Sequence, residues 1–304
     1  MPKRHAKTIS LFDFMQQYPA EQDAIGYFEK TRWGDEPFCT KCGCAGRITP
    51  QKNYKKGYWC GDCRSYFNAF TNTPLEHSRV DARKWMFAAY LLMTARKGIS
   101  AMQLSKELDV SYPTAWYMLH RLRVACGSDQ EALSGDVEID AGYLGGKESN
   151  KHANKKLKAG RGTVGKQPVL GMRQRKGKVK AMVVKGEDKK TVYNAIHAHV
   201  ETRSTIYADD HKGYRGTGEL FYHHESVNHS TREHVNGMAH TNGIESVWAL
   251  LKRGFNGIYH NWSRKHCQKY VNEFTFRLNE GNCSRDTQDR LDSLFGAMPG
   301  KNHL

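Results

Sequence analysis

The sequence predicts a multidomain protein that combines a zinc ribbon, a helix-turn-helix and a mixed α/β domain. Three observations predict this fold class: two cysteine pairs, two helical stretches joined by a short turn, and a final run of strands and helices. A chain of 304 residues can form two or three compact units of about 150 residues or fewer. The expected domains are a helical leader at 1–36, the zinc ribbon at 37–72, the helix-turn-helix at 78–126, the α/β domain at 136–282 and a polar tail at 283–304.

The zinc ribbon is predicted from cysteine spacing. Two Cys-x2-Cys pairs are separated by 17 residues, and each pair can form a tight turn that presents two thiolates to one ion. Such closed four-thiolate sites are structural, whereas redox pairs or free thiols are the alternative reading of the same cysteines. Aromatic residues around the second pair, Tyr58, Trp59, Tyr66 and Phe67, are expected to pack the small core. The expected zinc ligands are Cys39, Cys42, Cys60 and Cys63.

The helix-turn-helix is predicted for the segment 98–123, with a turn at Asp109-Val110. Ser111 can cap the second helix, and Pro113 is tolerated in its first turn. Helical spacing places Ala115, Met118, Leu119 and Leu122 on the buried face. An ordinary helical pair packed on a neighbour would show the same pattern. If the pair binds DNA, the outer face offers Thr114, Tyr117, Arg121 and Arg123 to a groove or to phosphates.

After a linker at 127–135 the hydrophobic period changes from helical to alternating. Strands followed by helices in this order predict a mixed α/β domain of catalytic size. We expect strands at 137–144 and 204–208, a hairpin of 169–175 with 179–185, and helices at 191–200, 242–255 and 263–280.

Carboxylates occur where these elements could bring them together. Asp140 lies within the first strand, Asp209 and Asp210 follow a later strand, and Glu245 lies on a helix. Strand ends and an opposing helix can gather three carboxylates, which could hold two Mg²⁺ ions about 3.5–4 Å apart for phosphoryl transfer. Glu138, on the same strand face as Asp140, is a rival ligand.

Lys252 lies seven residues after Glu245, about two helical turns, so both residues share one helix face. A cation at this position could bind a DNA phosphate. The alternative is an ordinary surface lysine.

The chain carries a formal net charge of +16, with 47 Lys and Arg against 31 Asp and Glu. Between Lys147 and Lys180 there are twelve basic residues and one acid, Glu148. Such a segment attracts polyanions, of which nucleic acid is the commonest inside cells, although a solvated loop without a ligand is the alternative. The expected DNA contacts in this segment are Lys155, Lys156, Lys158 and Arg161.

Membrane and secreted proteins are poor matches to this sequence. The longest apolar stretch, 85–95, is too short to span a bilayer, and no apolar segment follows the basic N-terminus. The cysteine pattern favours a reducing compartment, so we expect no membrane partner and a cytoplasmic location.

Several stretches together resemble the DDE transposases of bacterial insertion sequences, most closely the ISXO-like group with an N-terminal zinc ribbon. The resemblance runs in the family's order over roughly residues 10–280. Its segments are YWCGDCRSYF at 58–67, VEIDAGYLGGK at 137–147, ADDHKGY at 208–214, HTNGIESVWALLKR at 240–253, GIYH at 257–260 and YVNEFTFRLN at 270–279.

The resemblance implies a ribonuclease-H-like core with Asp140, Asp209 and Glu245 as catalytic metal ligands. The family pattern places its second Asp five residues before a Tyr, which selects Asp209 over Asp210. Lys252 matches an extra lysine of the group, and Ala141 stands where the family often has an acid. The implied cofactors are structural Zn²⁺ and catalytic Mg²⁺, with Mn²⁺ as a substitute.

The implied function is an insertion-sequence transposase that binds terminal inverted repeats and catalyses strand cleavage and strand transfer. Its partners would be double-stranded DNA of the transposon ends and target, and further copies of itself, in the nucleoid of a bacterial cytoplasm. Two alternatives remain open from the residues alone. One is a DNA-binding regulator derived from a transposase, and the other is a metal-dependent nuclease that cuts without joining.

Overall fold

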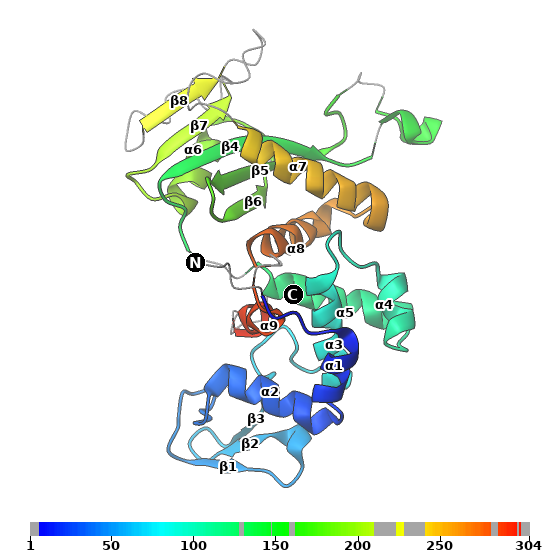
Figure 1. The fold of residues 1–304 in the computed structure, drawn as a ribbon, viewed down its shortest axis with the longest axis vertical. Coiled ribbons are helices and arrows are strands. Elements are labelled where there is room, and N and C mark those ends of the chain that lie inside the picture. Colours follow the sequence, from blue (N-terminus) through cyan, green and yellow to red (C-terminus); the bar gives the residue numbers. More distant parts are fainter. Residues whose placement is uncertain are drawn as a thin grey trace. The chain divides into compact units, whose positions relative to one another are not determined.

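A computed structural model of the chain describes residues 6–127, 131–146, 148–157, 162–209, 223–227, 241–280, 285–296 and 298. The chain divides into two compact units, Met1–Asp129 with Glu280–Leu304, and Gln130–Asn279 (Figure 1). Within the described residues, no helix has the length and apolar character needed to cross a membrane.

The first unit joins segments that the sequence predicts as separate domains. The leader, the cysteine-rich segment and the helical pair belong to one unit, together with a helix near the C-terminus. Its elements are α1 (Leu11–Gln17), α2 (Glu21–Trp33), β1 (Ile48–Pro50), β2 (Tyr58–Cys60), β3 (Ser65–Phe67), α3 (Ala82–Thr94), α4 (Ala101–Glu107), α5 (Tyr112–Ala125) and α9 (Thr287–Gly296).

The three short strands form an antiparallel sheet in the order β1-β2-β3. The rings of Tyr58 and Phe67 stack on this sheet with their centroids 5.5 Å apart. Trp33, the last residue of α2, packs edge-on against both rings at 5.6 and 5.7 Å. The predicted aromatic core is therefore confirmed for Tyr58 and Phe67, whereas Tyr66 is 48% exposed and lies outside it. Trp33 explains why the leader and the cysteine-rich segment form one unit.

The predicted turn between α4 and α5 is confirmed by Asp109, which has a positive φ of 48°. The Ser111 hydroxyl accepts the N–H of Thr114 at 3.4 Å and caps α5, as expected. The predicted apolar face of α5 is buried: Ala115, Met118, Leu119 and Leu122.

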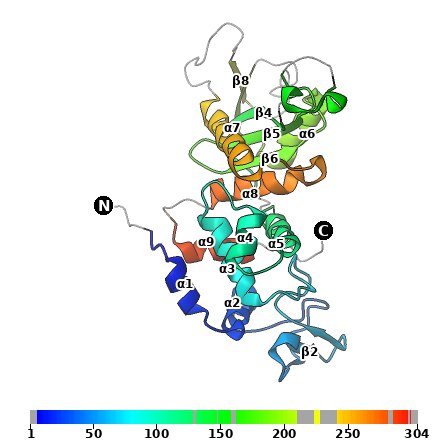
Figure 2. The same cartoon turned by 90° about the vertical axis from the view of Figure 1, so that its right-hand side faces the viewer.

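The prediction of a polar tail is wrong for residues 287–296, which form α9. This helix packs against α2 and α3 (Figure 2). Leu291 and Leu294 are fully buried, and the Phe295 ring lies 4.7 Å from the ring of Phe28. The apolar positions 291, 294 and 295 carry a helical period that the surrounding polar residues obscure.

The second unit is built on a five-stranded sheet in the order β6-β5-β4-β7-β8. In this sheet β4 pairs antiparallel with β5 and β5 with β6, so the predicted hairpin is confirmed. In contrast, β4 pairs parallel with β7 and β7 with β8. The strands are β4 (Asp136–Leu144), β5 (Gln167–Gln174), β6 (Val179–Val183), β7 (Thr205–Asp209) and β8 (His223–Val227). The sequence pattern does not predict β8, because its residues, HHESV, show no alternation of apolar and polar side chains.

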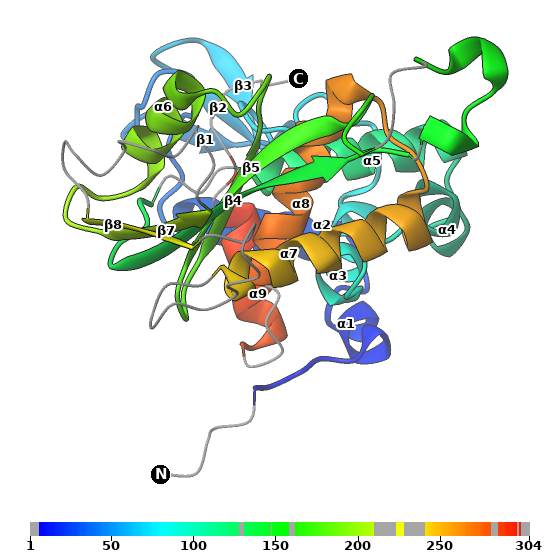
Figure 3. The ribbon, with the colours of Figure 1, turned by 90° about the horizontal axis from the view of Figure 1, so that it is seen from above.

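Helices cover both faces of this sheet (Figure 3). On one face, α6 (Lys189–His199) packs on Val137 and Ile139 of β4. On the other face, α7 (Asn242–Gly254) and α8 (Cys267–Asn279) share a core with Leu144 and Val169. Because side chains alternate along a strand, Asp140 lies on the face covered by α7.

Candidate active site

The helix α7 lies unusually close to the sheet. A Cβ atom added to Gly142 or Gly171 would come within 2.7 or 2.6 Å of the Trp248 ring, so only glycine fits at these two positions. The Trp248 indole N–H donates to Asp140 Oδ2 at 2.9 Å. The two glycines thus allow a helix side chain to reach and orient the central carboxylate of β4.

Glu138 fixes the start of α7. Its side chain is 2% exposed, and its Oε2 atom accepts the backbone N–H of Ile244 at 2.9 Å. Its Oε1 atom lies 3.2 Å from Nε of Arg175, whose guanidinium lies 3.8 Å over the Tyr207 ring. A carboxylate at a helix N-terminus also interacts favourably with the helix dipole. Both Glu138 oxygens are therefore engaged, which argues against its role as a rival metal ligand.

This buried polar layer lies beside all three elements that carry the predicted acids. Three members of the layer lie one or two residues before a predicted ligand on the same element. Glu138 lies two residues before Asp140, Tyr207 two before Asp209, and Ile244 one before Glu245.

Glu245 lies exposed in the first turn of α7, where Thr241 Oγ1 is 3.3 Å from its Oε1 atom. Asp209 is the last residue of β7. Because β4 and β7 run parallel with Ile139 opposite Ala208, the backbone of Asp209 continues this register beside Asp140. The Asp209 side chain and the whole of Asp210 lie outside the described residues.

Three of the four predicted catalytic residues line one cleft. Asp140, Glu245 and Lys252 all border a cavity of about 1100 Å³ between α7 and the end of β4. Lys252 is on the face that Glu245 occupies, as the helical spacing predicts. The structure thus brings together residues that are more than 100 positions apart in the sequence.

The surroundings of Asp140 suit a bound cation. Burial raises the pKa of its carboxyl group, the N–H groups of Ala141 and Trp248 oppose this shift, and the carboxylates of Glu245 and Glu187 add to it. A divalent cation would relieve the repulsion between these carboxylates, and carboxylate oxygens are the ligands that Mg²⁺ prefers.

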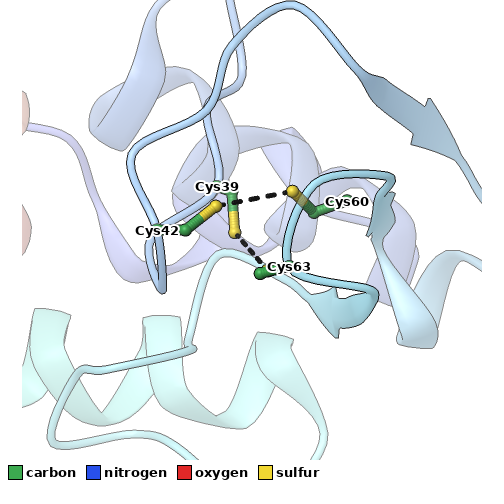
Figure 4. A group of neighbouring side chains, drawn as sticks. All are labelled: Cys39, Cys42, Cys60 and Cys63. Atoms are coloured by element: carbon green, nitrogen blue, oxygen red, sulfur yellow. Dashed lines mark hydrogen bonds between the residues drawn. The ribbon is translucent and has the colours of Figure 1, made fainter.

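The four predicted zinc ligands form one cluster (Figure 4). One sulfur from each of Cys39, Cys42, Cys60 and Cys63 lies within 4.8 Å of all the others. A tetrahedral zinc site with Zn–S bonds of about 2.3 Å places its sulfurs about 3.8 Å apart. Two sulfur–sulfur distances of 3.6 Å, Cys39–Cys63 and Cys42–Cys60, join the two cysteine pairs, which a redox disulfide within each pair does not predict.

The four thiols differ in acidity. Backbone hydrogen bonds from Cys63 and Asp62 lower the pKa of the Cys60 thiol, whereas burial raises the pKa of the Cys63 thiol. Cys44 is outside the four-sulfur group, as the spacing predicts. The cluster could therefore bind zinc as a closed structural site.

Fewer of the predicted outer residues of α5 are exposed than its sequence predicts. Thr114 is half-buried and Tyr117 is 43% exposed, as expected for an outer face. Arg121 and Arg123, however, are only 5% and 1% exposed, so their expected exposure is wrong. Arg121 donates to the carbonyl of Glu76 at 2.8 Å and stacks over the Tyr117 ring at 4.3 Å. Its guanidinium satisfies a backbone carbonyl, which helical spacing alone does not reveal.

In the basic segment, Lys155 and Lys156 are exposed, as expected. Lys158 and Arg161 lie outside the described residues. Glu148, the segment's acid, accepts hydrogen bonds from Lys151 and from the Leu157 N–H, and these contacts hold its pKa below the usual range.

Neither Trp248 nor the capping role of Glu138 is predicted from the sequence. Trp248 follows Glu245 by three residues, so helical spacing already places both on one face. The glycines in strands β4 and β5 were a second signal, because glycine inside a strand often marks a close approach.

The fold and the cleft define an α/β domain that gathers acids and a lysine in a cleft beside its central strand. A family of ISXO2-like transposase domains matches residues 132–279. The segment 132–279 is therefore similar to this family, and the match supports an insertion-sequence transposase.

Two further similarities accompany the family match. A protein from Halobacterium salinarum, described as an uncharacterized protein in transposable element ISH50, is 29% identical over 275 residues, covering 86% of this chain and 92% of that protein. A chain in a complex of the simian T-cell lymphotropic virus intasome is 14% identical, with a TM-score of 0.29, over 62% of this chain and 65% of that one.

Proposed function

We propose that the chain binds the ends of its own transposable element and catalyses metal-dependent cleavage and strand transfer of DNA. The observation that carries this proposal is the cleft shared by Asp140, Glu245 and Lys252, with the Asp209 backbone beside Asp140. A cleft that joins carboxylates for metal ions with a lysine for phosphate suits phosphoryl transfer on a polyanion.

We propose a ribonuclease-H-like fold for the second unit. Its sheet combines an antiparallel hairpin at one side with parallel strands at the other, around the central strand β4. The carboxylate on β4 and the helix α7 that crosses this face support the same assignment.

In this proposal, Asp140, Asp209 and Glu245 hold two Mg²⁺ ions, for which Mn²⁺ can substitute. Two such ions, when bound, lower the pKa of the attacking water or hydroxyl and stabilise the charge on the leaving oxygen. Trp248 keeps the Asp140 carboxylate in one orientation, and the Glu138 layer fixes the helix that carries Glu245. The Lys252 ammonium binds a phosphate close to the reacting one.

The first unit would recognise DNA. The zinc ribbon and a helix-turn-helix formed by α4 and α5 would read the terminal inverted repeats, with Thr114 and Tyr117 on the exposed side of α5. Lys155, Lys156, Lys158 and Arg161 would bind flanking or target backbone. Because two ends must be joined, copies of the chain would assemble on the DNA of the bacterial nucleoid.

The proposal is tested by incubating the protein with Mg²⁺, end-containing DNA and a plasmid target, and then looking for joined products. Glu245→Gln and Asp140→Asn should abolish joining, because each removes a charged metal ligand. Glu201→Gln is the matched control and should retain joining, because this exposed acid follows α6, the helix on the other face of the sheet. Joined products from either cleft variant would contradict the assignment.

The same experiment separates the two alternatives. Cut but unjoined DNA would identify a nuclease. Binding without any cut would identify a regulator.

A further inference from the structure

The cleft continues well beyond its acidic end. Three polar residues, Lys252, Asn256 and His260, follow Glu245 along its lining. At a helical rise of 1.5 Å per residue, Lys252 lies about 10 Å and His260 about 20 Å from Glu245 along the axis. The cleft is thus polarised, with carboxylates at one end and hydrogen-bond donors at the other.

The donor end is built on an unusual backbone. The residues Phe255–Tyr259 form a π-helical turn at the end of α7, and His260 follows with a positive φ of 56°. The N–H of His260 donates to the Phe255 carbonyl at 2.7 Å, which closes the turn. π-Helical turns and left-handed non-glycine residues are both costly and are concentrated at functional sites.

Buried groups hold this turn in place. The Tyr259 hydroxyl donates to Glu273 Oε1 at 2.6 Å, and Glu273 is fully buried on α8. Arg277 lies 3.4 Å from the same carboxylate. The Phe255 ring packs edge-on against Trp262 at 4.4 Å. His260 itself is exposed on the cleft, so the buried network supports a side chain that has no packing role of its own.

The opposite wall supplies further donors. Asn150, Thr163 and Lys166, from the connection between β4 and β5, line the same cleft. Arg264 donates to the Gly165 carbonyl at 3.3 Å and so links this wall to the segment that follows His260. Among the described lining residues, the only acids are Asp140 and Glu245 at the far end.

We propose that Asn256 and His260 bind the sugar-phosphate backbone of the DNA strand whose reacting phosphate lies at the carboxylates. This inference rests on the proposed function. It extends that function with two DNA-binding residues and with the direction in which the DNA strand runs along the cleft. Hydrogen-bond donors with no carboxylate beside them are suited to bind successive phosphate groups of a DNA strand. A cavity of about 1100 Å³ exceeds the range of about 300–1000 Å³ typical of small-molecule pockets.

The spacing predicts which phosphates are bound. A DNA strand advances about 3.4 Å per nucleotide along the duplex axis, so a separation of about 20 Å corresponds to about six nucleotides. His260 should therefore contact a phosphate about six nucleotides from the reacting one, and Asn256 a phosphate between them.

The test is a phosphate-ethylation interference map of end-containing duplex DNA with the full chain, combined with the affinity from fluorescence anisotropy. His260→Gly removes the imidazole and relieves the positive φ, so the melting temperature should stay the same or rise. Its affinity for DNA should fall about fivefold, equally for any base sequence at that place, because a phosphate contact carries no sequence information. Interference should disappear at the distal phosphate only.

Asn256→Ala should remove interference at a phosphate closer to the cut. His197→Ala and Asn194→Ala are matched controls, because both side chains are exposed on α6, which covers the other face of the sheet. Both controls should leave the map unchanged.

If His260→Gly and Asn256→Ala both keep the wild-type interference map and still cut DNA, this inference is wrong. The proposed function is not contradicted by that result. If the wild-type chain shows no interference and no cutting, the proposed function fails as well. A melting temperature lowered in His260→Gly together with a uniformly weakened map would show that His260 is structural, and would also overturn the inference.

Discussion

Trp248 connects the helix that carries Glu245 with the strand that carries Asp140. Its indole N–H donates to the Asp140 carboxylate, and its ring lies against two glycines. Trp248→Phe keeps an aromatic ring on the glycines but removes the donor. Because loss of a hydrogen bond to a metal ligand typically costs about 10–100-fold in metal affinity or activity, we expect Mn²⁺ affinity and strand transfer to fall by about tenfold.

Mn²⁺ titration and the joining reaction measure this effect. Trp262→Phe is the matched control for the titration, since that ring stacks on Tyr270 and is not among the described residues that line the cleft. Equal Mn²⁺ affinity in Trp248→Phe and wild type would show that the hydrogen bond does not orient a metal ligand.

Glu138 is predicted to contribute stability and not metal binding. Glu138→Gln removes the buried charge that faces Arg175, whose side chain is 14% exposed, and breaking a buried ion pair typically costs about 3–5 kcal/mol. We expect a clearly lower unfolding temperature for the second unit, measured by calorimetry on the full chain. Glu131→Gln, which breaks the more exposed pair with Lys178, should cost less than about 1 kcal/mol. Unchanged stability with lost Mn²⁺ affinity would instead make Glu138 a ligand.

At the scale of elements, α2 and α9 share a partly buried hydrogen bond that makes stability depend on pH. Tyr27 donates to Asp292 at 2.6 Å, and burial together with this bond raises the pKa of Tyr27 above its ordinary value. As the pH rises above about 10, Tyr27 ionises in the unfolded chain but keeps its proton in the folded one. The unfolded state then binds fewer protons, so stability falls as the pH rises.

Tyr27→Phe should reduce this loss, by up to about 1.4 kcal/mol per pH unit above pH 10, while costing about 1 kcal/mol at neutral pH. Melting temperatures between pH 8 and 11 measure both effects. Tyr66→Phe, at an exposed tyrosine of the same unit, is the control. Parallel curves for Tyr27→Phe and wild type would show that the α2–α9 contact does not carry the dependence.

Elements with a clear hydrophobic period were predictable, and those held mainly by distant contacts were not. The capped helix α5 and the hairpin β5–β6 carry their signals locally, in Ser111 and in the Lys176-Gly177 turn. In contrast, β8 is polar and α9 has only three apolar positions. Both are stabilised by partners elsewhere in the chain, β7 for β8 and α2 and α3 for α9, which a local pattern cannot reveal.

The candidate site was predictable in its chemistry but not in its supports. The types and order of residues indicate Asp140, Glu245 and Lys252, and the cleft brings these three together. Trp248 and Glu138 act through a sheet-to-helix contact that depends on strand register. The buried position of Arg121 likewise depends on a carbonyl from another segment, so helical spacing alone misassigns it.

At the scale of the whole molecule, the division into two units predicts that zinc binding and Mn²⁺ binding can be lost separately. Zinc should be bound at one ion per chain by the four cysteines, and Cys60→Ser should lose it because a three-thiolate site is incomplete. Since the small β1–β3 sheet has little core beyond its aromatic rings, loss of zinc should unfold it and abolish selective binding of end DNA. Metal analysis and anisotropy with end and random duplexes measure these two losses.

The second unit has its own core and its own carboxylates, so Cys60→Ser should keep the wild-type Mn²⁺ affinity. Glu245→Gln should show the converse pattern, with zinc and end binding retained and Mn²⁺ affinity reduced. The pair of variants distinguishes two units with separate tasks from one cooperative structure, because a cooperative chain would lose both properties in both variants. Loss of Mn²⁺ binding in Cys60→Ser would therefore show that the zinc cluster supports the catalytic unit as well as the recognition of DNA.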